Sequence, residues 1–172
     1  MSKGRVLVGE SEGNYLIKMS GDVRVTLCAS LNRYVESIFT NSDAKTVLVD
    51  LLDAEGLDST TLGLLAKLGM SSKRYYDIVP LLFCENEDIL KIFEMMSLDE
   101  FFTIIRKDLP ETALGKNAVQ ELPCCDGAPE DEDEARRSVL EAHRLLVEIN
   151  PKCEPDFVDL IRYLEEEVSK HP

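Results

Sequence analysis

The sequence predicts an α/β fold with the element order ββαβαβαβ, a mostly parallel sheet with crossover helices, followed by a C-terminal two-helix extension. Two patterns support this prediction. Over residues 1–107, apolar runs of strand length alternate with segments whose apolar residues recur at helical spacing. After residue 107, two longer segments each carry one apolar stripe. Strands joined by helical crossovers in one sheet run parallel.

The first part of the chain supplies the strands and helices of this order. Strands are predicted at residues 5–10, 15–19, 46–51, 78–84 and 101–105, and helices at 27–38, from 59 onwards and at 87–95. The composition of Ser11-Glu12-Gly13-Asn14 is typical of a hairpin turn between the first two strands. Pro80 cannot donate a ladder hydrogen bond, so its strand is expected at an edge or with a bulge.

The composition divides the chain into three parts. Residues 1–107 are expected to form one domain, residues 108–129 a linker because prolines and glycines gather there, and residues 130–170 a helical hairpin. The stripe of the first hairpin helix consists of Ala135, Val139, Ala142, Leu146 and Ile149, and that of the second of Phe157, Leu160, Ile161, Leu164 and Val168. Both stripes must be buried against another surface.

The net charge of −14 argues against nucleic-acid binding, because phosphate backbones are bound by clustered Lys and Arg. Residues 1–107 hold 12 Lys and Arg against 16 Asp and Glu, a net charge of −4, and residues 108–172 hold 7 against 17, a net charge of −10. The acidic run 130–134 favours a helix start, or alternatively docks a basic partner. Apolar windows are too short for a membrane span or a signal peptide, so a cytoplasmic protein without membrane contact is expected.

The candidate functional stretch is Asp58-Ser59-Thr60-Thr61. Asp58 is predicted to be the N-cap of a helix. Ser59 then lies in the first turn, where unpaired N–H groups and the positive end of the helix dipole favour negative charge. A phosphate there adds about −1.5 to −2 charges without unfolding the helix. Taken alone, the same residues are also an ordinary helix cap.

Catalytic, cofactor and metal sites are not expected. A hydrolase serine needs a base, but the only histidines, His143 and His171, lie in the extension, and the sequence has no G-x-S-x-G elbow or nucleotide-binding glycine loop. Asp50 as a receiver-type acceptor is less favoured than Asp50 as a strand terminus. The five cysteines form no C-x-x-C pair, and the adjacent Cys124 and Cys125 with His143 lack the spacing of metal ligands.

An acidic residue followed by Ser, then Ser or Thr, with Leu-Gly shortly after, resembles the phosphoacceptor motif of STAS-domain anti-sigma factor antagonists. The motif maps the phosphoacceptor onto Ser59, and the element order resembles the STAS (SpoIIAA-like) fold. Residues 21–28 (Gly21-Asp22-Val23-Arg24-Val25-Thr26-Leu27-Cys28) and 58–68 are similar to the HsbA branch, of the HptB-dependent secretion and biofilm pathway, which also carries an acidic helical extension. The resemblance implies a partner-binding surface of Asp22, Arg24, Asp58, Thr60 and Thr61.

The resemblance implies partner switching rather than catalysis. The unphosphorylated protein would bind an anti-sigma factor, FlgM-like in the HsbA branch, and so release a sigma factor. The phosphorylated protein would turn to a diguanylate cyclase and favour biofilm growth over motility, and a serine kinase and a phosphatase would set the ratio. The alternative is a constitutive signalling scaffold that binds partners through the acidic hairpin. The hairpin itself could pack on its own domain, cover Ser59 or pair between chains.

Two positions depart from the wider family. Arg24 stands where many antagonists have a carboxylate, and Thr61 where they tend to have glycine. A positive charge at Arg24 would favour a phosphorylated Ser59 and change which kinase recognises the surface. The alternative is that Arg24 is a solvated loop charge.

Overall fold

The computed structural model describes residues 2–40, 43–107, 119–123 and 129–171. Within these ranges the strands form one six-stranded sheet in the order β5-β4-β3-β2-β1-β6. The strands are β1 (Arg5–Ser11), β2 (Asn14–Val23), β3 (Thr46–Leu57), β4 (Leu81–Phe83), β5 (Thr103–Ile105) and β6 (Val119–Glu121). β1 is antiparallel to both of its neighbours, whereas β2, β3, β4 and β5 run parallel. The predicted order ββαβαβαβ and the mostly parallel sheet are confirmed.

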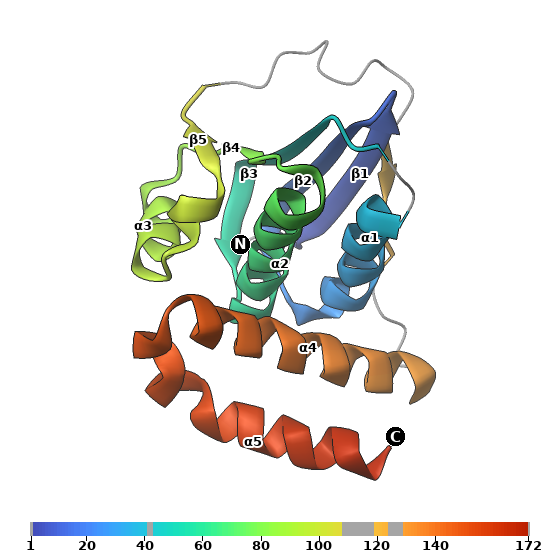
Figure 1. Ribbon diagram of the computed structural model, residues 1–172, viewed down its shortest axis with the longest axis vertical. Coiled ribbons are helices and arrows are strands. Elements are labelled where there is room, and N and C mark those ends of the chain that lie inside the picture. Colours follow the sequence, from blue (N-terminus) through green and yellow to red (C-terminus); the bar gives the residue numbers. More distant parts are fainter. Residues whose placement is uncertain (1, 41–42, 108–118, 124–128, 172) are drawn as a thin grey trace.

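Three helices connect the parallel strands: α1 (Cys28–Thr40), α2 (Ser59–Tyr76) and α3 (Glu87–Met95). The short 3₁₀ segments η1 (Val25–Leu27) and η2 (Leu98–Phe101) adjoin α1 and β5. Helices α1 and α2 lie side by side on one face of the sheet (Figure 1). Successive strand residues alternate between the faces, so Ile17 and Val49 join the main core under the helices, whereas Leu16 and Leu48 belong to a smaller apolar cluster.

Strand β3 is longer than predicted. The expected strand ended at residue 51, but β3 continues to Leu57 and stays paired with β2 through two register shifts. Asp50 is therefore inside the strand and only 3% exposed, not a strand terminus. Its Oδ1 accepts a hydrogen bond from the backbone N–H of Leu52 at 2.9 Å. Because β3 follows β2 to its end, it leads directly into Asp58 and α2.

The prediction of an edge strand or bulge at Pro80 was wrong. Strand β4 pairs with β3 on one side and with β5 on the other, in unshifted register. Pro80 precedes β4 and contributes only its carbonyl oxygen, which accepts a hydrogen bond from the N–H of Thr103 at 2.9 Å. Pro80 thus lies just outside the hydrogen-bonded ladder, where its lack of an N–H group costs no ladder bond. The strand predicted at 78–84 is accordingly shorter in the structure, at Leu81–Phe83.

The segment predicted as a linker, residues 108–129, contains strand β6. β6 pairs antiparallel with Leu7–Gly9 of β1, and the N–H of Leu122 donates to the carbonyl of Val6 at 2.8 Å. The hydroxyl of Ser30 in α1 donates to the carbonyl of Pro123 at 2.7 Å. Residues 119–123 are therefore part of the edge of the sheet, because β1 has backbone N–H and C=O groups on this side that β6 can pair with. Residues 108–118 and 124–128 of the predicted linker lie outside the described residues.

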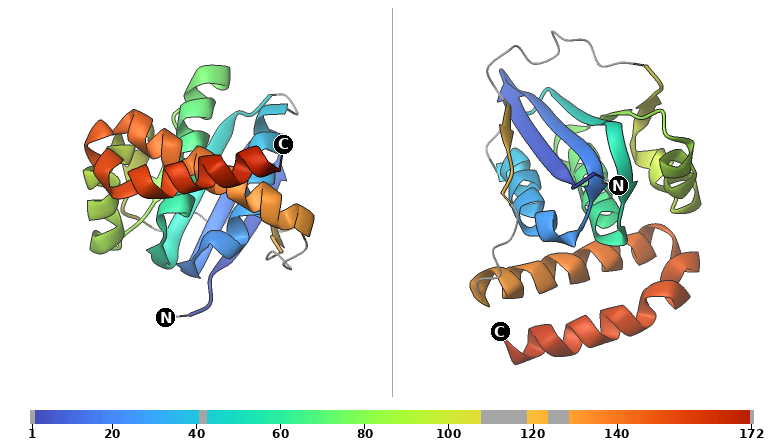
Figure 2. Two further views of the ribbon diagram at one scale, coloured as in Figure 1. Left: turned by 90° about the horizontal axis from the view of Figure 1, so that it is seen from below. Right: turned by 180° about the vertical axis from the view of Figure 1, so that it is seen from behind.

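The extension consists of α4 (Pro129–Ile149), the 3₁₀ segment η3 (Pro151–Cys153) and α5 (Glu154–Lys170). Helix α4 crosses the N-terminal ends of α1 and α2, and α5 lies along the far side of α4 (Figures 1 and 2). Leu146 and Cys153 belong to the main core, so the hairpin packs on its own domain. Leu160, predicted in the buried stripe of the second helix, is 38% exposed, because α5 contacts α4 rather than the sheet domain.

Candidate functional site

Asp58 caps α2 as predicted. Its backbone is extended (φ −84°, ψ 172°), and its Oδ1 accepts hydrogen bonds from the Thr61 amide at 2.9 Å and from the Thr61 hydroxyl at 2.8 Å. The Asp58 carbonyl accepts the first helical bond, from the Leu62 amide at 3.1 Å. Ser59 is thus the first residue of α2, beside backbone N–H groups that have no partner inside the helix.

The hydroxyl of Ser59 contacts a histidine of the extension. Ser59 is half-buried, and its Oγ lies 2.8 Å from Nε2 of His143 in α4. Nδ1 of His143 lies 2.7 Å from the carbonyl oxygen of Val139. Because a carbonyl only accepts, Nδ1 carries the proton, and in the neutral ring Nε2 accepts from the Ser59 hydroxyl. The imidazole is 1% exposed and packs edge-on against Phe157 of α5, with 4.9 Å between ring centroids.

The separation of Ser59 from a base, expected from the sequence, was therefore wrong. A serine hydrogen-bonded to a histidine is the arrangement of an activated nucleophile. Here, however, the ring is enclosed between α2, its own helix and Phe157, so a substrate has no approach to the side of the imidazole. The pair joins two helices and satisfies a buried polar ring. The sequence indicated only that His143 lies next to Ala142 of the predicted apolar stripe, and not that it contacts Ser59.

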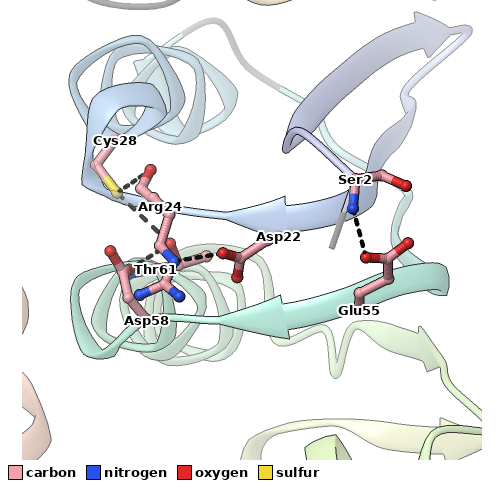
Figure 3. A network of polar contacts seen from close by, with 7 residues as sticks. All are labelled: Ser2, Asp22, Arg24, Cys28, Glu55, Asp58 and Thr61. Carbon is pink, nitrogen blue, oxygen red and sulfur yellow. Dashed lines mark hydrogen bonds and ion pairs between the residues drawn. The ribbon is translucent and has the colours of Figure 1, made fainter.

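Thr60 and Thr61 do not belong to an accessible surface, in contrast to the prediction. Thr60 is 4% exposed and Thr61 is fully buried. The Thr61 hydroxyl lies 3.6 Å from the thiol of Cys28, in addition to its bond with Asp58 (Figure 3). Thr61 therefore has a structural function, in the cap and in the packing of α2 against α1.

Asp22 and Arg24 form a pair beside the cap, as Figure 3 shows. Nε of Arg24 donates to Oδ2 of Asp22 at 2.7 Å. The hydrogen bond with Asp22 raises the pKa of Arg24, and the nearby charge of Asp58 acts in the same direction. The side chain of Arg24 is 59% exposed, so it is a solvated charge, and its ion-pair partner is Asp22 of β2. Asp22 and Arg24, together with Ser2, line a pocket of about 230 Å³.

The described residues contain no group of three or more His, Cys, Asp or Glu side chains arranged for a metal ion. Cys124 and Cys125 lie outside the described residues. Cys28, Cys84 and Cys153 are buried, and burial raises the pKa of the Cys84 and Cys153 thiols. None of the helices in the described part of the chain has the length and apolarity that a membrane crossing needs.

Comparison with known proteins supports the fold through structure alone. No protein-family model matches the sequence, and a comparison with curated proteins finds no match. Among solved structures, an anti-sigma factor antagonist from Mycobacterium paratuberculosis matches with a TM-score of 0.51 and 17% sequence identity. The match covers 64% of this chain and 91% of that chain. The chain thus has the α/β fold of an anti-sigma factor antagonist, and the STAS-type fold predicted from the sequence is confirmed.

Proposed function

We propose that this protein is an anti-sigma factor antagonist controlled by phosphorylation of Ser59. The observation that carries the proposal is the position of Ser59, the first residue of a helix capped by Asp58, in a fold shared with an anti-sigma factor antagonist. The proposed surface for the partner is centred on Ser59 and includes Asp22, Arg24 and Asp58. It is a binding function, and no catalytic step is assigned to the Ser59–His143 pair.

The proposed mechanism is a difference in affinity between the two forms. A phosphate at Ser59 adds about −1.5 to −2 charges at the positive end of α2, which the helix tolerates. That charge weakens a complex with an acidic or apolar surface and creates a pairing site for Arg or Lys on another partner. A tenfold preference requires only about 1.4 kcal/mol.

The proposed partners follow from the resemblance to the HsbA branch. The unphosphorylated form binds a FlgM-like anti-sigma factor in the cytoplasm and releases the sigma factor. The phosphorylated form binds a diguanylate cyclase, and a serine kinase and a phosphatase set the balance between motility and biofilm growth.

Two measurements test the proposal. Mass spectrometry of the protein from its native cells, with and without phosphatase treatment, should place a phosphate on the peptide that contains Ser59. In binding assays with a purified FlgM-like protein, Ser59→Ala should bind and should not respond to the kinase. Ser71→Ala, a second half-buried serine of α2, serves as the control and should behave as the unchanged chain does. Phosphorylation that persists in Ser59→Ala, or an anti-sigma factor that never binds, would contradict the proposal.

The scaffold alternative has one observation in its favour, the acidic character of the hairpin. Residues 108–172 carry a net charge of −10, with 7 Lys and Arg against 17 Asp and Glu. Asp159 and Glu166 of α5 are exposed. Charge reversal to Asp159→Lys and Glu166→Lys leaves the Ser59 surface intact. If these changes abolish partner binding while Ser59→Ala leaves both binding and its response to the kinase unchanged, the hairpin is the binding element and the switch proposal is wrong.

A further inference from the structure

The hairpin packs closely against the face formed by α1 and α2, next to Ser59. This α1–α2 face includes Arg33, Gly63 and Lys67. Helix α4 passes over α2 at Gly63, where an added Cβ would lie 2.5 Å from both the Cβ and the carbonyl oxygen of Ala142. Contacts this short cannot be accommodated without moving backbone, so only glycine fits at residue 63 while α4 is docked. Gly63 lies one helical turn after Ser59, on the same side of α2. The backbones of α2 and α4 therefore meet next to the candidate acceptor.

Charged side chains hold the edge of the same interface. Nζ of Lys67, one further turn along α2, lies 2.8 Å from Oε1 of Glu141 in α4 and 2.9 Å from Oε1 of Glu36 in α1. The side chain of Lys67 is only 13% exposed. Arg33 of α1 lies 3.4 Å from Glu134 of α4. Lys67 and Arg33 of the α1–α2 face thus pair with acidic residues of the hairpin. The hairpin is therefore electrostatically complementary to this face.

A phosphorylated Ser59 is incompatible with this contact. Phosphorylation places a phosphorus atom and three oxygens on Oγ, but Oγ is already 2.8 Å from a buried ring nitrogen. If the phosphoserine side chain rotates away into solvent instead, Nε2 of His143 loses its partner inside a buried site, which is unfavourable. In both cases the bond that holds α4 at the start of α2 is lost.

We propose that the hairpin is an intramolecular inhibitor of the α1–α2 face around Arg33, Gly63 and Lys67, and that docking of the hairpin and phosphorylation of Ser59 exclude each other. The side chain of Arg24 is 59% exposed with the hairpin docked, so Arg24 and its partner Asp22 stay available to the anti-sigma factor that binds the unphosphorylated form. Phosphorylation then releases α4 and α5 and exposes two surfaces together. One is the α1–α2 face with Arg33 and Lys67, and the other is the apolar stripe of α4 with Ala142 and Leu146. The inference rests on the proposed modification of Ser59 and gives its physical effect: the phosphate changes which surfaces are available as well as adding charge.

The test installs phosphoserine at residue 59 of the full chain during translation, so that neither the kinase nor a partner is needed. Hydrogen–deuterium exchange of the peptides that cover α4 and the start of α2 reports docking. Release should accelerate exchange in these peptides by at least about tenfold, because protection there depends on the packed interface. Small-angle X-ray scattering should show a larger radius of gyration for the phosphorylated chain.

Gly63→Ala provides a second route to the released state without a phosphate. Alanine favours the helical state of α2 more than glycine does, so faster exchange in α4 would report the clash with Ala142 and not a weakened helix. Gly69→Ala is the matched control, since its Cβ would meet Phe101 of η2 at 2.8 Å and does not face α4. A general loosening of α2 would appear in both variants, whereas release of the hairpin should appear only in Gly63→Ala.

Two results would overturn the inference. In the first, phosphoserine leaves exchange and radius of gyration as they are in the unmodified chain. In the second, exchange in α4 becomes slower, which would mean that a protonated His143 pairs with the phosphate and holds the hairpin in place. Neither result bears on whether Ser59 is phosphorylated in cells or which protein binds, so failure here is distinguishable from failure of the proposed function.

Discussion

Asp58 stabilises the first turn of α2 through one carboxylate oxygen, which accepts hydrogen bonds from the amide and from the hydroxyl of Thr61. Removing an N-cap carboxylate costs about 0.5–2 kcal/mol, and the buried Thr61 hydroxyl loses a partner as well. We expect Asp58→Ala to lower the free energy of unfolding in urea by about 2 kcal/mol. Asp43→Ala, at an exposed loop carboxylate, should change it by less than about 0.5 kcal/mol. Equal effects would contradict the cap.

The two histidines form a natural pair of test and control. His143 is buried between Ser59 and Phe157, whereas the side chain of His171 is exposed. His143→Ala removes a buried hydrogen bond and leaves a cavity, so we expect the free energy of unfolding to fall by about 3 kcal/mol. For His171→Ala we expect a change below about 0.5 kcal/mol in the same denaturant titration. A small effect at residue 143 would show that its contacts contribute little.

Part of the candidate site around Ser59 could be predicted from the sequence. Asp58, Ser59 and Thr61 lie within one turn, so capping rules predict their arrangement from local spacing. The burial of Thr61 could also have been inferred, because Thr61, Leu65 and Leu68 share one face of α2 at helical spacing. His143 could not be inferred as the partner of Ser59, because 84 residues separate them and their contact depends on where α4 docks.

Lys67 links three helices and gives a pH-dependent prediction. Desolvation lowers the pKa of Lys67, but its hydrogen bonds with Glu141 and Glu36 together outweigh it, so the pKa lies above the ordinary 10.5. A raised pKa means that the ammonium stabilises the fold at pH values below the ordinary one and that this contribution disappears as the pH rises through the folded-state pKa. Lys67→Met should therefore be less stable than the unchanged chain near neutral pH, with a difference that shrinks in strongly alkaline solution.

Urea titrations at several pH values measure this difference. Lys73→Met is the control, because Lys73 pairs with Asp77 at an exposed position of the same helix and exposed pairs contribute little. A difference between Lys67→Met and the unchanged chain that does not vary with pH would show that the loss comes from packing and not from the ammonium.

Helices and strands were predictable to different degrees. The apolar period placed α3 at residues 87–95, as the structure has it, because an amphipathic helix carries its own signal. β6 consists of Val119, Gln120 and Glu121, all exposed, and it exists only because β1 offers a ladder. The extension of β3 to Leu57 likewise depends on β2 as its partner. Such strands are defined by long-range pairing, which a local pattern does not contain.

Leu146 connects the hairpin to the main core and tests whether the molecule unfolds as one unit. It is a fully buried residue of α4 within the core cluster of the sheet domain. Leu146→Ala should lower the free energy of unfolding by about 2–5 kcal/mol while the transition stays single. Leu160→Ala, the matched change at an exposed leucine of α5, should cost less than about 1 kcal/mol. Two separate transitions, followed by circular dichroism, would instead show that the hairpin unfolds on its own.

The bond from Ser30 to Pro123 fixes the chain to α1 six residues before the first residue of α4, Pro129. A hairpin that leaves the domain is therefore still held within a short radius of its former position. Such tethers produce local concentrations in the millimolar range. Any protein that binds the uncovered α1–α2 face must compete with the tethered hairpin. A ligand with a micromolar dissociation constant therefore binds only when phosphorylation of Ser59 prevents the hairpin from docking again.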